Sequence, residues 1–140
     1  MLRTLLAASA VMAGLSVPAL ASGDIANGEK EFGKCKSCHA VVAPDGTEIV
    51  KGGKTGPNLY GVIGRVAGTA EGFRYSPSMK AAGEKGLVWD IETFDEYTHD
   101  ATKFLQAYLG DSKAKSTMTF KLRKGGEDIA AWLASISPSN

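Results

Sequence analysis

The chain has 140 residues, the length of one ordinary domain, and carries 16 Lys and Arg residues against 15 Asp and Glu residues. This balance gives no reason to expect a strongly charged partner. The sequence also has no basic stripe interleaved with aromatic residues, the pattern that favours nucleic-acid binding. Composition therefore indicates a single domain and argues against a nucleic-acid partner.

Residues 1–21 have the features of a secretory signal peptide. Arg3 gives a positive start, residues 5–20 carry no charge and are mostly apolar, and residues 19–21 form a small-x-small cleavage site. The apolar run is shorter than a typical membrane span, so we expect cleavage rather than a retained anchor. One domain of residues 22–140 would then reach the periplasm, with no stable membrane insertion.

A first helix is predicted over residues 22–34. Asp24 is a suitable N-cap, and Ile25, Gly28 and Phe32 recur at helical spacing. Glycine inside a helix lowers the stability of that helix. Close approach of a second helix would explain its presence at position 28.

The sequence Cys35-Lys36-Ser37-Cys38-His39 follows this helix directly. Cys-x-x-Cys-His is the attachment signature of a c-type haem, because two thiols on one turn can reach both vinyl groups of one haem. The histidine that follows would lie under the iron and ligate it. The motif uses both cysteines of the chain, so none is left for a structural disulfide. The export signal agrees with this interpretation, since bacterial c-type haem is attached on the periplasmic side.

Two other kinds of site use a Cys-x-x-Cys pair. Zinc could recruit His39 and His99, but the sequence has no second cysteine pair and no closely spaced histidine pair. A redox dithiol would need alternating strands and helices, and that pattern is absent from the sequence. The motif therefore favours haem over both.

The rest of the chain is predicted to form short helices joined by long loops, with no convincing strand. Residues 43–54 are predicted to be a polar loop because they contain several turn signals. Further helices are predicted from capping residues and helical periodicity over residues 59–63, 76–82, 90–98, 101–109 and 127–136. The fold class is therefore all-α, with a haem supplying much of the core.

The second axial ligand has three candidates. Met118 lies in a loop between two predicted helices, far downstream of His39, where it could cover the far face of a haem. Met79 lies early in a short helix and is interpreted as packing or surface, the commoner role of methionine. His99 lies in a very polar run and is expected to be exposed. Met118 is thus the favoured ligand, and it would close the site to oxygen and peroxide.

The sequence resembles the class I cytochromes c, and more closely the cytochrome c2 group of purple and related proteobacteria. The resemblance runs from Gly28 to Leu133. It rests on ordered motifs: Gly28-x-x-x-Phe32, Cys35-x-x-Cys38-His39, residues 55–59, Gly64-Arg65, Trp89, Tyr97, Met118-Thr119-Phe120 and residues 129–133. It implies an all-α class I cytochrome c fold wrapped around one covalent haem c, with crossing N- and C-terminal helices.

The resemblance also implies roles around the iron. Cys35 and Cys38 would form the haem thioethers, and His39 and Met118 would be the axial ligands. The carbonyl of Pro57 would accept the N–H of His39 and fix its ring. Ser116 would lie near the methionine sulfur.

Further residues would complete the haem pocket. Arg65, Tyr75 and Trp89 would donate to the propionates, which need partners in a poorly solvated interior. Tyr97 would place its hydroxyl beside the sulfur, and Phe120 would cover the haem face. Ordinary aromatic core is the alternative for Tyr75 and Trp89.

This sequence departs from many relatives at three places. Ala101 stands where many carry proline, Thr117 where many carry lysine, and about ten extra residues near 106–115 lengthen the loop on the methionine side. These departures leave the ligand set intact. They affect which partner protein binds this surface.

The function implied is a monomeric periplasmic electron carrier rather than an enzyme. The donor would resemble a bc1-type complex, and the acceptor would be a photosynthetic reaction centre, a terminal oxidase or a periplasmic reductase. Docking would use lysines near the haem edge: Lys34, Lys36, Lys54, Lys80, Lys103, Lys115, Lys121 and Lys124. The alternatives are a small haem peroxidase or gas-binding protein with a labile sixth ligand, and a zinc-stabilised module.

Overall fold

The computed structural model describes residues 23–137, so the predicted signal peptide lies outside the described residues. The helices are α1 (Ile25–Glu31), the 3-10 helix η1 (Phe32–Lys34), α2 (Pro77–Glu84), α3 (Ile91–His99), α4 (Ala101–Leu109) and α5 (Gly126–Ile136). Two short antiparallel strands, β1 (Val41–Val42) and β2 (Glu48–Val50), form a hairpin. Within residues 23–137, no helix is long and apolar enough to cross a membrane.

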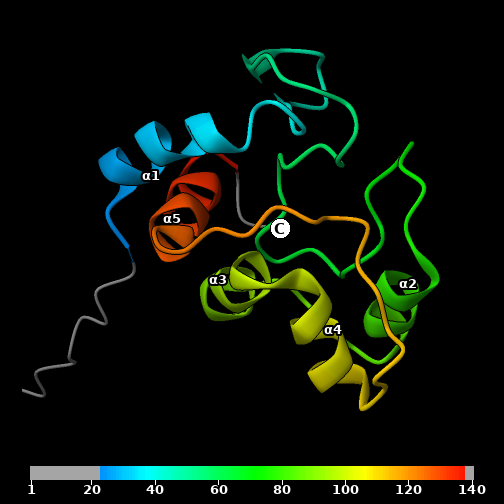
Figure 1. The fold of residues 1–140 in the computed structure, drawn as a ribbon. Coiled ribbons are helices and arrows are strands. Elements are labelled where there is room, and N and C mark those ends of the chain that lie inside the picture. The colour runs from blue at the N-terminus through cyan, green and yellow to red at the C-terminus, as the bar shows by residue number, and fades with distance from the viewer. Residues whose placement is uncertain (1–22, 138–140) are drawn as a thin grey trace, which may run out of the picture.

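The first and last helices pack against each other, as Figure 1 shows for α1 and α5. A Cβ atom added to Gly28 would lie closer than 3.0 Å to Asp128 and Trp132, so only glycine permits this approach. Next to that contact, the rings of Phe32 and Trp132 lie 5.0 Å apart. The expected crossing of the terminal helices is therefore present, and it explains the glycine inside α1.

Local capping signals set most helix starts as predicted. The side chain of Asp24 accepts the N–H of Asn27, and Ser76 accepts that of Met79. Asp90 forms a capping box with Thr93 at the start of α3. These bonds satisfy backbone donors that the first turn of a helix leaves unpaired. The first helix is shorter than predicted because its last turn tightens into η1 before the cysteine motif.

The helix predicted over residues 59–63 does not form. The Asn58 side chain, at the N-cap position of such a helix, accepts the N–H of Tyr60 at 3.1 Å but also that of Val42 at 3.0 Å, which ties it to β1. Gly61 then adopts a left-handed conformation with φ of 69°, which ends any helical path. The segment is therefore a series of turns tied to β1.

The strands β1 and β2 were not expected from the sequence. They lie in or beside the predicted loop 43–54, and only two and three residues pair. A turn at Gly46 connects them, with the N–H of Thr47 bonded to the Asp45 side chain at 2.9 Å. Strands this short leave no recognisable alternation in the sequence, and the fold remains mostly helical, as predicted.

Candidate cofactor site

One cavity, about 250 Å³ in volume, is lined by every residue predicted for haem binding. Cys35, Cys38 and His39 come from the turn after η1, and Met118 comes from the segment between α4 and α5. The other predicted residues also line it: Pro57, Arg65, Tyr75, Trp89, Tyr97 and Phe120. Segments far apart in the sequence therefore meet around one space.

The cysteine motif folds into a single hydrogen-bonded turn. The N–H groups of Cys38 and His39 both donate to the carbonyl of Cys35, at 3.1 and 3.0 Å. No disulfide joins Cys35 and Cys38. Burial raises the pKa of the Cys35 thiol to about 11, whereas the hydroxyls of Thr55 and Ser37 lower the pKa of the exposed Cys38. Two available thiols thus stand next to the histidine, at the edge of the cavity.

The ring of His39 is held in one tautomer. Its Nδ1 lies 2.8 Å from the carbonyl oxygen of Pro57, and a carbonyl can only accept a hydrogen bond. Burial lowers the pKa of His39, which favours the neutral ring. In a neutral ring with a proton on Nδ1, Nε2 carries the free lone pair. His39 is therefore prepared to ligate a metal ion through Nε2.

A glycine-containing loop packs against the motif from outside. The N–H of Gly53 donates to the carbonyl of Lys36 at 2.9 Å, and that of Gly56 donates to Cys38 at 2.8 Å. A Cβ atom on Gly56 would lie closer than 3.0 Å to three atoms of the His39 ring. The turn signals predicted a loop here, but the close contact with the ring is visible only in the structure.

Hydroxyl groups surround the backbone of Met118 on the other side. The N–H of Met118 donates to Ser116 Oγ at 3.1 Å, and that oxygen lies 2.8 Å from the hydroxyl of Tyr97. Burial raises the pKa of Tyr97, so the phenol stays protonated at neutral pH. Ser116 and Tyr97 therefore form a hydrogen-bonded chain with the backbone N–H of Met118, and their proximity to its sulfur stays a prediction.

Arg65 brings a half-buried positive charge to the cavity wall. Its guanidinium donates to the backbone carbonyls of Tyr60 and Asn58, both at 3.2 Å. Among residues 23–137, no carboxylate forms an ion pair with it. Burial lowers the pKa of Arg65, and the Tyr75 hydroxyl partly offsets that effect. A cation in this setting suits an anionic group inside the cavity.

Comparisons with known proteins agree with this geometry. The chain is 64% identical to cytochrome c-551 of Roseobacter denitrificans over 125 residues, 89% of each chain. It is 56% identical to cytochrome c2 of Rhodobacter capsulatus over 133 residues, 95% of this chain and 96% of the relative. The solved structure of Rhodobacter capsulatus cytochrome c2 superposes with a TM-score of 0.80 at 60% identity, covering 81% of this chain and 98% of that one.

The chain belongs to the cytochrome c2 family. A scan against protein-family models found no match, so the assignment rests on these relatives and structures. Cytochromes c2 and c-550 are electron carriers and not enzymes, and they carry one covalent haem c. The same therefore holds for this member, and the peroxidase and zinc-module alternatives are wrong.

The residues around the cavity of this family member fit a haem. Two thiols, a histidine with a free Nε2 and an uncompensated guanidinium lie around a space whose other walls are largely apolar. Apolar lining comes from Leu59, Val62, Met79 and Phe94. Met79 is only 7% exposed, so it belongs to the core, one of the two alternatives predicted for it.

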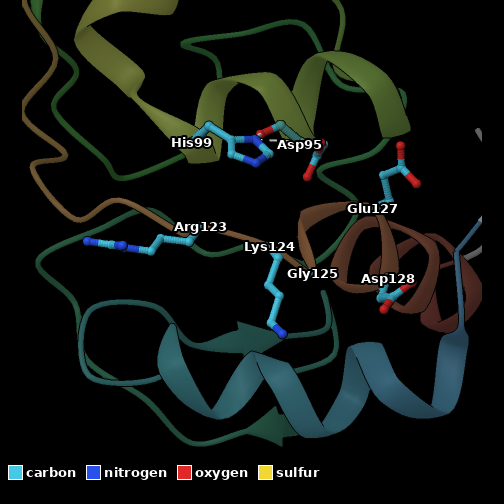
Figure 2. A pocket seen from close by; sticks show the side chains of 7 residues that line it. All are labelled: Asp95, His99, Arg123, Lys124, Gly125, Glu127 and Asp128. Atoms are coloured by element: carbon cyan, nitrogen blue, oxygen red, sulfur yellow. Dashed lines mark hydrogen bonds and ion pairs between the residues drawn. The ribbon is translucent and has the colours of Figure 1, made fainter.

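His99 lies away from this cavity, at a second and more open one of about 280 Å³ (Figure 2). It is exposed, as expected, and its Nδ1 donates to the carbonyl of Asp95 at 2.8 Å. Figure 2 shows the side chains of Arg123 and Lys124 extending away from it. Within residues 23–137, no three His, Cys, Asp or Glu side chains are grouped as a metal site.

Proposed function

We propose that this cytochrome c2-family member shuttles single electrons in the periplasm, with Cys35 and Cys38 as haem thioethers and His39 and Met118 as axial ligands. The supporting observation is that these four residues, from two distant segments, line the same cavity. The haem iron supplies the chemistry by alternating between its ferric and ferrous states. The chain supplies a fixed set of ligands, which keeps atomic rearrangement small.

The two ligands set the electronic character of the site. The bond from His39 to the Pro57 carbonyl makes the imidazole a stronger donor and fixes its orientation. A methionine thioether favours ferrous iron and raises the reduction potential relative to a harder ligand. With His39 and Met118 both bound to the iron, the protein would exchange electrons without admitting a substrate there.

The surrounding residues would bind and shield the haem. Arg65, Tyr75 and Trp89 line the cavity, where we assign them to the propionates. We assign the Tyr97 hydroxyl to the neighbourhood of the Met118 sulfur. Phe120 lines the cavity while 46% of it stays exposed, which suits an aromatic cover at the haem face.

Docking would use the positive rim of the site. All eight lysines predicted for docking are exposed. Lys115 and Lys121 bracket the cavity-lining residues 116–120, and Lys34 itself lines the cavity. We propose a bc1-type complex as donor and a reaction centre, terminal oxidase or periplasmic reductase as acceptor, with the carrier acting as a monomer. Such contacts bury less than about 1,200 Å² and are short-lived.

The visible spectrum of ferrous protein, matured in a periplasm with haem supplied, tests the site. We expect a sharp low-spin c-type spectrum that carbon monoxide does not change, because Met118 closes the sixth position. A strong shift with the gas would show an open iron and contradict the proposed ligand set. Fractionation of the expressing cells tests the compartment separately, since a cytoplasmic haem protein would contradict the periplasmic assignment.

A further inference from the structure

The Met118 loop, defined as residues 110–118, contains no helix or strand among its described residues. In Figure 1 the segment between α4 and α5 passes close to α2 before it reaches the C-terminal helix. A long irregular loop costs conformational entropy to order, and this one must hold its methionine in a single position. Its backbone therefore needs partners from the helices around it.

Side chains of α2 and α4 supply those partners. Gln106 Nε2 donates to the carbonyls of Ser112 and Ala114, both at 3.2 Å. The N–H of Lys115 donates to Ser78 Oγ at 3.0 Å.

The next bond, from Ser116, reaches α4. The N–H of Ser116 donates to Thr102 Oγ1 at 3.1 Å. Together with the bonds from Gln106 and Ser78, it ties successive residues of the loop to two helices before the methionine is reached.

Thr102 connects to Met118 through one intermediate residue. Ser116 donates its N–H to Thr102, and its hydroxyl in turn accepts the N–H of Met118 at 3.1 Å. Thr102 does not line the haem cavity, so it has no contact with the cofactor site of its own. Any effect of its hydroxyl on the iron must pass through Ser116 and the backbone of Met118.

We propose that Thr102 is a positioning residue that keeps Met118 on the iron, with Ser78 as a second anchor of the same loop. The proposal rests on Met118 being the axial ligand. The loop has a closed state, with the sulfur bound, and an open state that exposes the sixth position. The hydroxyl of Thr102 stabilises the closed state because opening breaks its bond with Ser116.

The test compares Thr102→Val with Thr102→Ser in the haem-loaded protein. Valine keeps the shape but removes the acceptor, and serine keeps the acceptor. Losing about 1 kcal/mol of net hydrogen bonding raises the open fraction about fivefold, and the apparent carbon monoxide affinity of the ferrous protein rises by the same factor. We expect that rise in Thr102→Val, with an earlier thermal loss of the ferric sulfur-to-iron charge-transfer band. Thr102→Ser should behave like the wild type.

Two further variants separate positioning from general stability. Ser78→Ala removes the neighbouring anchor and should raise carbon monoxide affinity about twofold to threefold, since a single exposed-loop bond contributes less. If Thr102→Val does not fold, Ser78→Ala tests the anchoring of the loop in its place. Asn27→Ala removes a 2.6 Å bond between α1 and Asp128, far from the loop. It should lower the free energy of unfolding without changing carbon monoxide affinity.

The outcomes distinguish the two proposals. If Thr102→Val and Ser78→Ala both keep the wild-type carbon monoxide affinity and lose the charge-transfer band at the wild-type temperature, the positioning role is wrong and the ligand set stands. If Asn27→Ala raises the affinity as much as Thr102→Val does, the effect is general destabilisation and the positioning role is again wrong. If the wild type already binds the gas strongly, Met118 is not a closed ligand and both proposals fail.

Discussion

Gly56 lies against the face of the His39 imidazole, so closely that an added Cβ atom would come within 3.0 Å of Cε1, Nδ1 and Nε2. The same loop holds the ring through the 2.8 Å bond from Nδ1 to Pro57. One short segment, residues 56–57, thus determines both the position and the tautomer of the proposed iron ligand.

Gly56→Ala should therefore displace the His39 ring or the loop. Overpacking of this kind costs about 1–3 kcal/mol, which we expect as a loss in the free energy of unfolding of the holoprotein. Gly33→Ala is a matched control, because a Cβ atom there would meet nothing within 4 Å. It should change stability by less than about 0.5 kcal/mol. Equal stability of the two variants in guanidinium titrations would contradict the role assigned to Gly56.

Parts of this fold could be predicted because their signals are local. The helix Ala101–Leu109 has the ends that its apolar periodicity and Gly110 predict. Gly110, with φ of 65°, ends it, and the structure adds Asp100 as its N-cap. The helix predicted over 59–63 failed because the side chain of Asn58 bonds to Val42, a residue distant in sequence. Capping residues predict a helix only when no distant backbone group competes for them.

The same distinction applies to the site. The cysteine motif can be recognised from the sequence because covalent attachment of haem requires a fixed spacing of the two cysteines and the histidine. The roles of Gly56, Ser78 and Thr102 depend on contacts with His39 and the Met118 loop, which are far away in the chain. A hydroxyl side chain has many ordinary roles, so the sequence alone gives no signal for Ser78 and Thr102. Gly56 falls within the motif of residues 55–59, but that motif does not reveal the contact of Gly56 with the His39 ring.

Met118 and Met79 both line the cavity, and substitution distinguishes them as ligands. Met118→Ala should open the sixth position, so that carbon monoxide affinity rises about tenfold or more and the reduction potential falls. Met79→Ala should leave both unchanged while costing about 2–5 kcal/mol of stability, because this side chain is buried. Spectra with the gas, potentiometry and denaturant titration measure the three quantities. The reverse pattern would make Met79 the ligand.

Asp128 makes the stability of the terminal helix pair depend on pH. Its carboxylate accepts the N–H of Asp24 at 2.7 Å and a side-chain N–H of Asn27 at 2.6 Å. The first of these bonds, followed by the second, lowers the pKa of Asp128 in the folded protein. A lowered folded-state pKa gives stability that is present above the unfolded pKa, about 3.9, and is lost as pH falls through the folded value.

Asp128→Asn should therefore cost most at neutral pH. Because the carboxylate is well solvated, we expect a loss of no more than about 1 kcal/mol at pH 7. The difference from the wild type should shrink below about pH 4, where the wild-type carboxylate begins to take up a proton. Guanidinium titrations between pH 7 and pH 3 measure both proteins. A difference that stays constant over this range would show that charge has no part in the contact.

Lys115 and Lys121 flank the segment 116–120 that lines the haem cavity, so they should meet an acidic partner at the point of electron transfer. Changing both to glutamate should slow electron exchange with a bc1-type complex about tenfold or more at low ionic strength, and much less at high salt. The double variant Lys30→Glu and Lys51→Glu carries the same net charge change on exposed lysines outside the cavity. It should retain a rate closer to that of the wild type.

Because Lys121 also pairs with Asp100 at 2.7 Å, Lys115→Glu alone checks that the effect is not a local structural one. Equal slowing by both double variants would mean that net charge, rather than a docking face around Met118, governs the encounter.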